Sequence, residues 1–461
     1  MVNKTLKRDL KQRHLTMISI GGVIGGGLFL GCGAAIHSGG PGTIITYLLV
    51  GTLVVFIMRM LGEMATVNPT SGSFSTYAEE EIGPWAGFTI GWLYWFFWAS
   101  IIPVEAMMGA SIVHQWFSAL PIGVLSFAFI FLLTITNIFS VRMYGEFEYW
   151  LSIIKVVAIS LFLVIGIGII LGLVPTFKSP GTANLFGHGG FIPNGLGPIL
   201  LAITTILFSF PGSEIVTIAA AESPNPKKSV MFAINSVVWR ILLFYLGSIA
   251  IIITVLPWSS SSILQSPFVI ILDKVGIPGA ATIMSFVILT AVLSCQNSGL
   301  YTASRMLYSL SKLGSAPKFL SEVNKKGTPV YAVIGSTIFS LVCAVLGFVS
   351  PDKLFVFLMN SSGAVMLLVY LVIAFSHLFM RRRLERENKD NLVVKMWLFP
   401  YLTYLTIASL IGILVYMGFV ESTRSQVLLT SLVAIIIVGS YFIFKRNSVT
   451  TNLVEKDVSI K

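Results

Sequence analysis

The sequence predicts an all-α polytopic membrane protein with about 12 transmembrane helices, and three observations support that prediction. The 461 residues are 55% hydrophobic and only 11% charged, whereas a soluble domain carries roughly 25% charged residues. The mean hydropathy of the chain is +0.89. Long windows, such as 14–58, 106–141 and 241–272, contain no Asp, Glu, Lys or Arg, and each is long enough for one or two spans of about 20 residues.

Glycine, proline and charged residues divide these windows into individual spans, because they end or interrupt apolar helices. We expect the spans near residues 16–36, 42–64, 86–117, 121–140, 147–172, 196–222, 237–256, 278–304, 329–349, 354–377, 396–418 and 425–444. The three cysteines lie inside apolar segments, so the sequence does not predict a disulfide framework.

The basic residues are distributed unevenly between the two sides of the membrane. The formal net charge is +11, and with a cytoplasmic N-terminus only four of the 30 Lys and Arg residues fall outside: Lys178, Lys274, Lys353 and Arg424. This asymmetry follows the positive-inside rule and predicts that both termini of a multi-pass membrane protein are cytoplasmic. Because topology accounts for the basic clusters, we expect membrane lipids and no nucleic acid as partners.

Two of the expected spans are interrupted. The stretch TMISIGGVIGGGLFLG, residues 16–31, has five glycines between Gly21 and Gly27, and ILFSFPGSEIV, residues 206–216, has Pro211 and Gly212. Glycine and proline both weaken helices, and unwound backbone at membrane depth is tolerated only where it lines a cavity or is buried in protein. For the glycines alone, close helix packing through pairs such as Gly27/Gly31 is an alternative.

The interruptions lie in spans one and six, and this spacing predicts an inverted repeat. Five spans separate the two starting points, so the second set of five enters the membrane from the opposite side. Interrupted helices at matching positions of inverted halves indicate a transporter binding site. We therefore expect a single membrane domain, 1–461. Within it lie repeat one at about 14–172, repeat two at about 196–377, two added helices at about 396–444, and cytoplasmic ends at 1–14 and 445–461.

Several motifs resemble one family from about residue 6 to about residue 445. They are LKRDLKQRHLTMISIGGVIGGGLFLG, GPGTIITYLLVG, RMLGEMATVNPTSGSFSTYA, GPWAGFTIGWLYWFFW, GEFEYWLSIIKVVAI, AAAESPNPKKSV and SVVWRILLFYLGSIAI. They are similar to bacterial amino acid permeases, in the amino acid transporter branch of the amino acid–polyamine–organocation superfamily. Within that branch the chain looks most like gamma-aminobutyrate permeases. The resemblance implies a LeuT-type 5+5 fold and proton-driven symport of amino acids, with an exchanger of the same fold as the alternative.

An amino acid carries one carboxylate and one ammonium group, and the interrupted spans offer groups that suit both. The N-terminus of a half-helix beginning at Gly25, Gly26 and Gly27 suits the carboxylate, because unpaired N–H groups and the positive dipole end lie there. Carbonyls near Val23, Ile24 and Ser209 suit the ammonium, and Gly212 lies in the matching break.

The resemblance implies that Phe208 is a gating aromatic; an ordinary core aromatic is the alternative. Pro211 departs from the usual residue of the family, so the substrate assignment stays open.

Charged residues inside spans are candidates for function. Glu105, midway along span three, is expected to bind the substrate amine or to carry a proton, with a structural hydrogen-bonding acid as the alternative. Glu214 follows the span-six break, and the resemblance implies a role in gating or proton coupling. Its alternative is a carboxyl group that hydrogen-bonds to free backbone.

Lys155 in span five is the candidate for proton coupling. The resemblance implies that a lysine here takes the place of the sodium ion found in sodium-coupled members of the fold, between spans one, five and eight. We expect its ammonium to donate to span-one carbonyls near Gly21 and Gly22, and its deprotonation to release them. The alternative is a lysine that extends to the membrane interface.

Other functional classes lack their signatures. The five histidines include no HExxH pair, and the chain has no Gly-x-Ser-x-Gly and no Gly-Lys dipeptide. A metalloprotease, a serine hydrolase or an ATP-driven pump would require these motifs. We therefore expect no enzyme activity, no catalytic residue, no metal and no cofactor.

Overall fold

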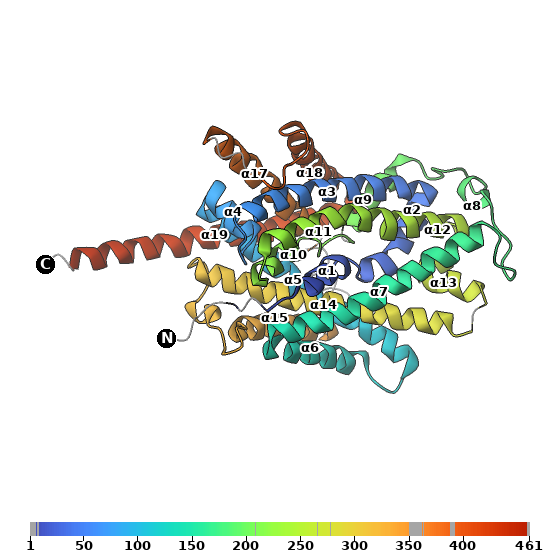
Figure 1. Ribbon diagram of the computed structural model, residues 1–461, viewed down its shortest axis with the longest axis horizontal. Helices are drawn as coiled ribbons and strands as arrows, with labels where there is room; N and C mark the ends of the chain where they lie inside the picture. Colours follow the sequence, from blue (N-terminus) through green and yellow to red (C-terminus); the bar gives the residue numbers. More distant parts are fainter. Residues whose placement is uncertain are drawn as a thin grey trace.

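The computed structural model describes residues 6, 9–207, 209–264, 266–276, 278–349, 362, 364–387 and 392–458. All elements in this part of the chain are helical, and no strand occurs in it (Figure 1). Nine helical stretches of the described residues are long and apolar enough to cross a membrane, and the helices Leu196–Leu207 and Val330–Leu346 are apolar but shorter. The helical membrane class is therefore confirmed.

The first part of the chain forms α1 (Gln12–Gly21), η1 (Gly27–Gly31), α2 (Cys32–Gly39), η2 (Gly40–Gly42), α3 (Thr43–Val67), α4 (Phe74–Glu81), α5 (Pro84–Trp116), α6 (Ile122–Phe139) and α7 (Val141–Ile170). The middle part forms α8 (Ala183–Phe186), α9 (Leu196–Leu207), α10 (Ile215–Ala219), η3 (Ala220–Glu222), α11 (Pro226–Arg240), η4 (Ile241–Leu246), α12 (Gly247–Val255), η5 (Ser261–Leu264) and α13 (Pro267–Lys274). The last part forms α14 (Ala280–Lys312), η6 (Lys318–Ser321), α15 (Val330–Val349), α17 (Val365–Arg386), α18 (Tyr401–Phe419) and α19 (Glu421–Val458).

Several helices are longer than the expected spans. The helix expected at 278–304 continues to Lys312, and the one expected at 237–256 begins at Pro226. Charged residues mark where a helix leaves the hydrocarbon, but they are good helix formers and do not end it. The first part of the span expected at 354–377 lies outside the described residues, and α17 begins at Val365.

Local signals explain where helices begin. Pro84, Pro226 and Pro267 each occupy the first turn of a helix, where proline is favoured because its missing N–H needs no partner there. The hydroxyl of Ser140 caps α7 by accepting a 3.1 Å hydrogen bond from the backbone N–H of Met143, which is the usual role of serine at this position.

The helices form a bundle in which α14 lies in the middle and packs against α5, α7 and α15 (Figure 1). The short helix α1 packs against α7, α11 and α10. In Figure 1, α17 and α18 lie along one edge of the bundle, and α6 and α15 along the other. Large apolar side chains such as Phe131, Trp150 and Val164 are exposed on the outside, as expected for a surface that faces lipid.

Candidate functional site

The interruption predicted in the first span is confirmed. α1 ends at Gly21, residues 22–25 are not helical, and the chain resumes as the π-helical segment η1 at Gly27. A Cβ atom on Gly31 would meet nothing within 4 Å, so close packing does not explain that glycine. A Cβ atom on Gly22, Gly25, Gly26 or Gly27, by contrast, would meet close neighbours.

The second predicted interruption is also present. α9 ends at Leu207, residues 209–214 are not helical, and α10 begins at Ile215. Phe208, the expected gating aromatic, lies outside the described residues. Gly212 has φ +111°, a conformation that favours glycine because it lacks a Cβ atom.

The two breaks touch each other through their backbones. A Cβ atom on Gly212 would lie 2.2 Å from the carbonyl oxygen of Gly22, and one on Gly27 would lie 2.9 Å from the Cα of Ser209. Glycine is therefore needed on both sides of the contact, because the atoms it meets belong to backbone and cannot rotate away.

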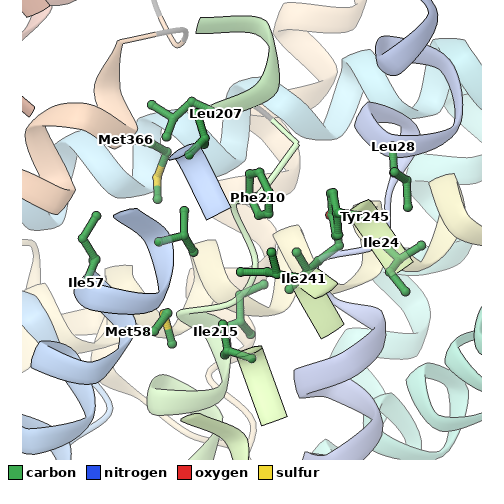
Figure 2. Packing of buried hydrophobic residues seen from close by; sticks show 14 of the residues in the cluster. Ile24, Leu28, Ile57, Met58, Leu207, Phe210, Ile215, Ile241, Tyr245 and Met366 are labelled. Atoms are coloured by element: carbon green, nitrogen blue, oxygen red, sulfur yellow. The ribbon is translucent and has the colours of Figure 1, made fainter. Parts of the chain in front are cut away.

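A tyrosine of span seven connects both breaks. The Tyr245 hydroxyl lies 2.8 Å from the carbonyl oxygen of Val23 and 2.6 Å from that of Ser209. Its ring stacks on Phe210, with the centroids 4.5 Å apart. In Figure 2 these two rings lie at the centre of the apolar cluster, between Leu207 and Ile24. Sequence reasoning missed Tyr245, because nothing in its span marks it out.

Glu105 of α5 lies beside the first break. Its Oε1 would be 3.7 Å from a Cβ on Gly25, and its Oε2 3.5 Å from a Cβ on Gly26. The side chain is buried, and Oε2 has no hydrogen-bond partner among the described residues. A buried acceptor without a donor is costly, so this oxygen is available to a cationic group that enters the break.

Lys155 of α7 also reaches the first break. Its Nζ donates to the carbonyl oxygen of Ile24 at 3.1 Å and to Ser294 Oγ of α14 at 2.7 Å. The side chain is fully buried. Spans one, five and eight therefore meet at this ammonium, but the span-one carbonyl that it contacts is that of Ile24 and not one near Gly21 or Gly22. The interface alternative does not describe its buried position.

Behind Lys155 lies a carboxylate that sequence reasoning missed. Ser294 Oγ donates to Oε1 of Glu148, which also accepts from Ser152 at 3.3 Å, and Asn297 Nδ2 lies 3.4 Å from Glu148 Oε2. Glu148 is fully buried. Its spacing from Lys155, seven residues or two helical turns, was the available signal, because such residues share one helix face.

Glu214 closes the second break from within. Its carboxylate accepts the backbone N–H of Gly212, at 3.1 Å to Oε1 and 3.0 Å to Oε2. The Tyr94 hydroxyl of α5 donates to it at 2.8 Å. This geometry matches the alternative stated above, a carboxyl group that hydrogen-bonds to free backbone.

The carbonyls expected to hold an ammonium already have donors. Those of Val23 and Ser209 accept from Tyr245, and that of Ile24 accepts from Lys155. A carbonyl oxygen has a second lone pair, so these groups are not excluded from ligand binding. Among the expected residues, however, Glu105 has the acceptor that is left without a partner.

A comparison with models of protein families identifies the family of this chain. A family model described as amino acid permease matches residues 14–454. The chain belongs to the amino acid permease family.

Three curated relatives of this amino acid permease cover nearly its whole length. It is 56% identical over 445 residues to the gamma-aminobutyric acid permease of Bacillus subtilis, which covers 96% of this chain and 95% of the relative. It is 48% identical over 438 residues to the gamma-aminobutyric acid permease of Escherichia coli, with 95% and 94% covered. A probable GABA permease of Pseudomonas aeruginosa is also 48% identical, with 94% and 91% covered.

Proposed function

We propose that this permease is a proton-coupled symporter that imports small amino acids, gamma-aminobutyrate among them, across the plasma membrane. The observation that supports this most is the junction of two helix breaks, with a buried carboxylate and a buried lysine that both reach the first one. The names of the relatives from B. subtilis and E. coli favour gamma-aminobutyrate as the substrate.

In this proposal the first break binds the two charged ends of the solute. Gly26 stands at the N-terminus of η1 without a side-chain cap, so the N–H groups at Gly25 to Gly27 are suited to the substrate carboxylate. The unpartnered oxygen of Glu105 then binds the ammonium group. In gamma-aminobutyrate three methylenes separate the ammonium from the carboxyl carbon, and Glu105 approaches the first break from a neighbouring helix.

Proton coupling is assigned to Lys155 and its relay. When protonated, the ammonium donates to Ile24 and Ser294, and Ser294 passes a hydrogen bond on to Glu148. When Lys155 releases its proton, its amine has one N–H donor fewer. The non-helical segment of span one then loses the hydrogen bond to Ile24 that supports it. Glu214 keeps the second break in shape, so its coupling role is secondary in this scheme.

The proposal includes the LeuT-type inverted repeat, with repeats at about 14–172 and 196–377 and the added helices at about 396–444. The matched breaks in spans one and six support it. It also includes cytoplasmic segments at 1–14 and 445–461, which the placement of basic residues favours.

Uptake into proteoliposomes tests the proposed transport. Purified protein is reconstituted into vesicles without internal substrate, and labelled gamma-aminobutyrate, alanine, proline and lysine are offered with and without an inward proton gradient. We expect concentrative uptake of a small amino acid that collapses when a protonophore is added. Uptake that requires internal amino acid and ignores the proton gradient would show an exchanger instead.

The coupling residue is tested by Lys155→Ala, with Lys178→Ala as the matched control in an exposed outer segment. We expect Lys155→Ala to bind substrate with an affinity near that of the wild type and to lose proton-driven accumulation, because in this proposal Glu105 and the N–H groups at Gly25 to Gly27 bind the substrate. The control should accumulate normally. Intact accumulation by Lys155→Ala would exclude the assignment.

A further inference from the structure

Arg240 is a buried arginine at the end of α11 that none of the roles above explains. Its side chain is 6% exposed. Nε and Nη2 make only long bonds of 3.4 Å, to the carbonyls of Ser236 and Ala233 in its own helix. Nη1 has no hydrogen-bond partner in the described part of the chain. This guanidinium is thus in protein interior with most of its donor capacity unused.

The other buried arginines of the described chain show what such a group normally has. Arg305 pairs with Glu222 at 2.8 Å, and Arg381 pairs with Glu63 at 2.8 Å. No ion pair of the described residues includes Arg240. An unpaired buried cation is strongly unfavourable, and intramembrane charges of this kind commonly mark a substrate or ion pathway. Arg240 therefore lacks an anionic partner among the described residues, and we infer that a molecule other than the protein supplies one.

The position of Arg240 indicates where that anion comes from. It lines a small hollow together with Val23 of the first break, Phe210 and Ser213 of the second, and Tyr245. It precedes Tyr245 by five residues, about 7.5 Å along a helix. With the topology proposed above, the span runs outward from Pro226, so Arg240 lies on the cytoplasmic side of the tyrosine that closes the junction.

We propose that Arg240 receives the carboxylate of the transported amino acid as it leaves the first break for the cytoplasm. The inference rests on the amino acid import proposed above and deepens it. The hollow measures about 10 Å³, which is room for no more than about one water molecule. The carboxylate reaches Arg240 only after the two breaks separate. The inner site is then a second binding station, distinct from the one at Gly25 to Gly27.

The chemistry of the hollow fits an amino acid with an apolar middle. The planar guanidinium presents parallel N–H groups that bind both oxygens of a carboxylate. Val23 and Phe210 offer apolar surface to methylene groups beside it. A free inorganic anion would bind the same guanidinium, so the test must distinguish that anion from the substrate carboxylate.

The test compares Arg240→Gln and Arg240→Lys with the wild type in inside-out and right-side-out membrane vesicles. We expect Arg240→Gln to raise the KM for substrate at the cytoplasmic face by about ten- to a hundredfold, the loss of a charge-assisted hydrogen bond. The KM at the outer face should stay near the wild-type value. Arg240→Lys should restore part of the inner-face affinity, because it keeps the charge. Equal inner-face KM values in wild type and Arg240→Gln would overturn the proposal.

Arg59→Gln is the matched control. Arg59 lies on α3, is partly exposed, and donates to the carbonyl of Lys395 and to Asn235, so it does not line the hollow. Its replacement should leave both KM values unchanged. A rise at the inner face equal to that of Arg240→Gln would mean that general loss of basic charge is responsible, and would overturn the proposal.

Two changes of the assay medium distinguish a substrate carboxylate from a free inorganic anion as the partner of Arg240. Wild-type vesicles should prefer gamma-aminobutyrate over its carboxamide at the cytoplasmic face, and Arg240→Gln should lose most of that preference. Replacing chloride by gluconate should change neither protein. If instead chloride stimulates the wild type and not Arg240→Gln, the site holds a free anion and the proposal is wrong.

A second variant covers the case in which Arg240→Gln does not fold. Val54→Leu narrows the same hollow from α3 without touching the guanidinium, and it should raise only the inner-face KM. An unchanged inner-face KM in Val54→Leu would overturn the proposal. A failure of the import proposal itself differs, because it appears already as absent uptake in the wild type.

Discussion

The two helix breaks meet at one point, yet they satisfy their free backbone in different ways. In span six the chain supplies its own carboxylate, since Glu214 accepts the N–H of Gly212. In span one no side chain caps η1, which begins at Gly27, and we propose that the carboxylate of the solute takes that place. The comparison teaches that a helix break can be completed from within the chain, as in span six, or, in the proposed function, by the transported molecule.

The most severe expected effect comes from the contact between the breaks. Gly212→Ala should prevent folding or lower the free energy of unfolding by more than about 1–3 kcal/mol, the cost of the backbone conformation alone. The new Cβ atom would also lie 2.2 Å from the carbonyl oxygen of Gly22. Yield and melting temperature in detergent measure the effect. Gly31→Ala, where a Cβ meets nothing within 4 Å, should be neutral. A stable Gly212→Ala would show that the breaks do not touch.

Filling the first break should weaken substrate binding and spare the fold. Gly26→Val places atoms where the first meets only the mobile end of Met108, at 2.6 Å, and the next neighbour is Glu105 Oε2 at 3.5 Å. We expect a folded protein whose affinity for substrate falls about ten- to a hundredfold, as charge-assisted bonds are lost. Isothermal titration measures it, with Gly31→Val as the control. Normal affinity would place the carboxylate site elsewhere.

Removing the Glu214 carboxylate from the second break should mainly lower the free energy of unfolding. Glu214→Ala leaves the N–H of Gly212 and the hydroxyl of Tyr94 without an acceptor, and each buried group costs about 1–3 kcal/mol. Glu214→Gln keeps one acceptor oxygen and should lose less. Melting temperatures of the two variants give the order. If Glu214→Gln melts like the wild type but no longer accumulates substrate, the carboxyl group serves coupling, and the distinction between the breaks no longer holds.

The smallest expected effect concerns the residue that both breaks share. Tyr245→Phe keeps the ring stacked on Phe210 and removes one hydroxyl, so the free energy of unfolding should fall by about 0.5–1.5 kcal/mol. Tyr401→Phe, at an exposed tyrosine of α18, should change nothing. A loss as large as that of Glu214→Ala would mean that Tyr245, rather than the glycines, holds the junction together.

Much of the fold was predictable because its signals are local. Composition and charge-free windows predict membrane helices without any knowledge of their neighbours. The glycines before η1 and the Pro211–Gly212 pair act on the backbone at their own positions, so both interruptions were found. Helix ends were less predictable: Lys312 ends α14 well beyond the expected boundary, because leaving the membrane and leaving the helix are separate events.

The partners of the site residues were not predictable, because they depend on how helices are rotated against one another. Lys155 and Glu105 were found as isolated charges in apolar windows. Ser294 contacts Lys155, and Tyr245 contacts the carbonyls of both breaks, from spans far away in the sequence. A tyrosine or serine within a span is unremarkable. Arg240 was counted only as one more basic residue, since its isolation appears only when every possible partner is placed.

The Tyr245 hydroxyl has one hydrogen but lies within bonding distance of two carbonyl oxygens. Only one of them receives the hydrogen at any instant. When spans one and six part in the proposed transport cycle, the phenol stays with one carbonyl and keeps a full bond. This hydroxyl therefore adds little to the enthalpy of opening.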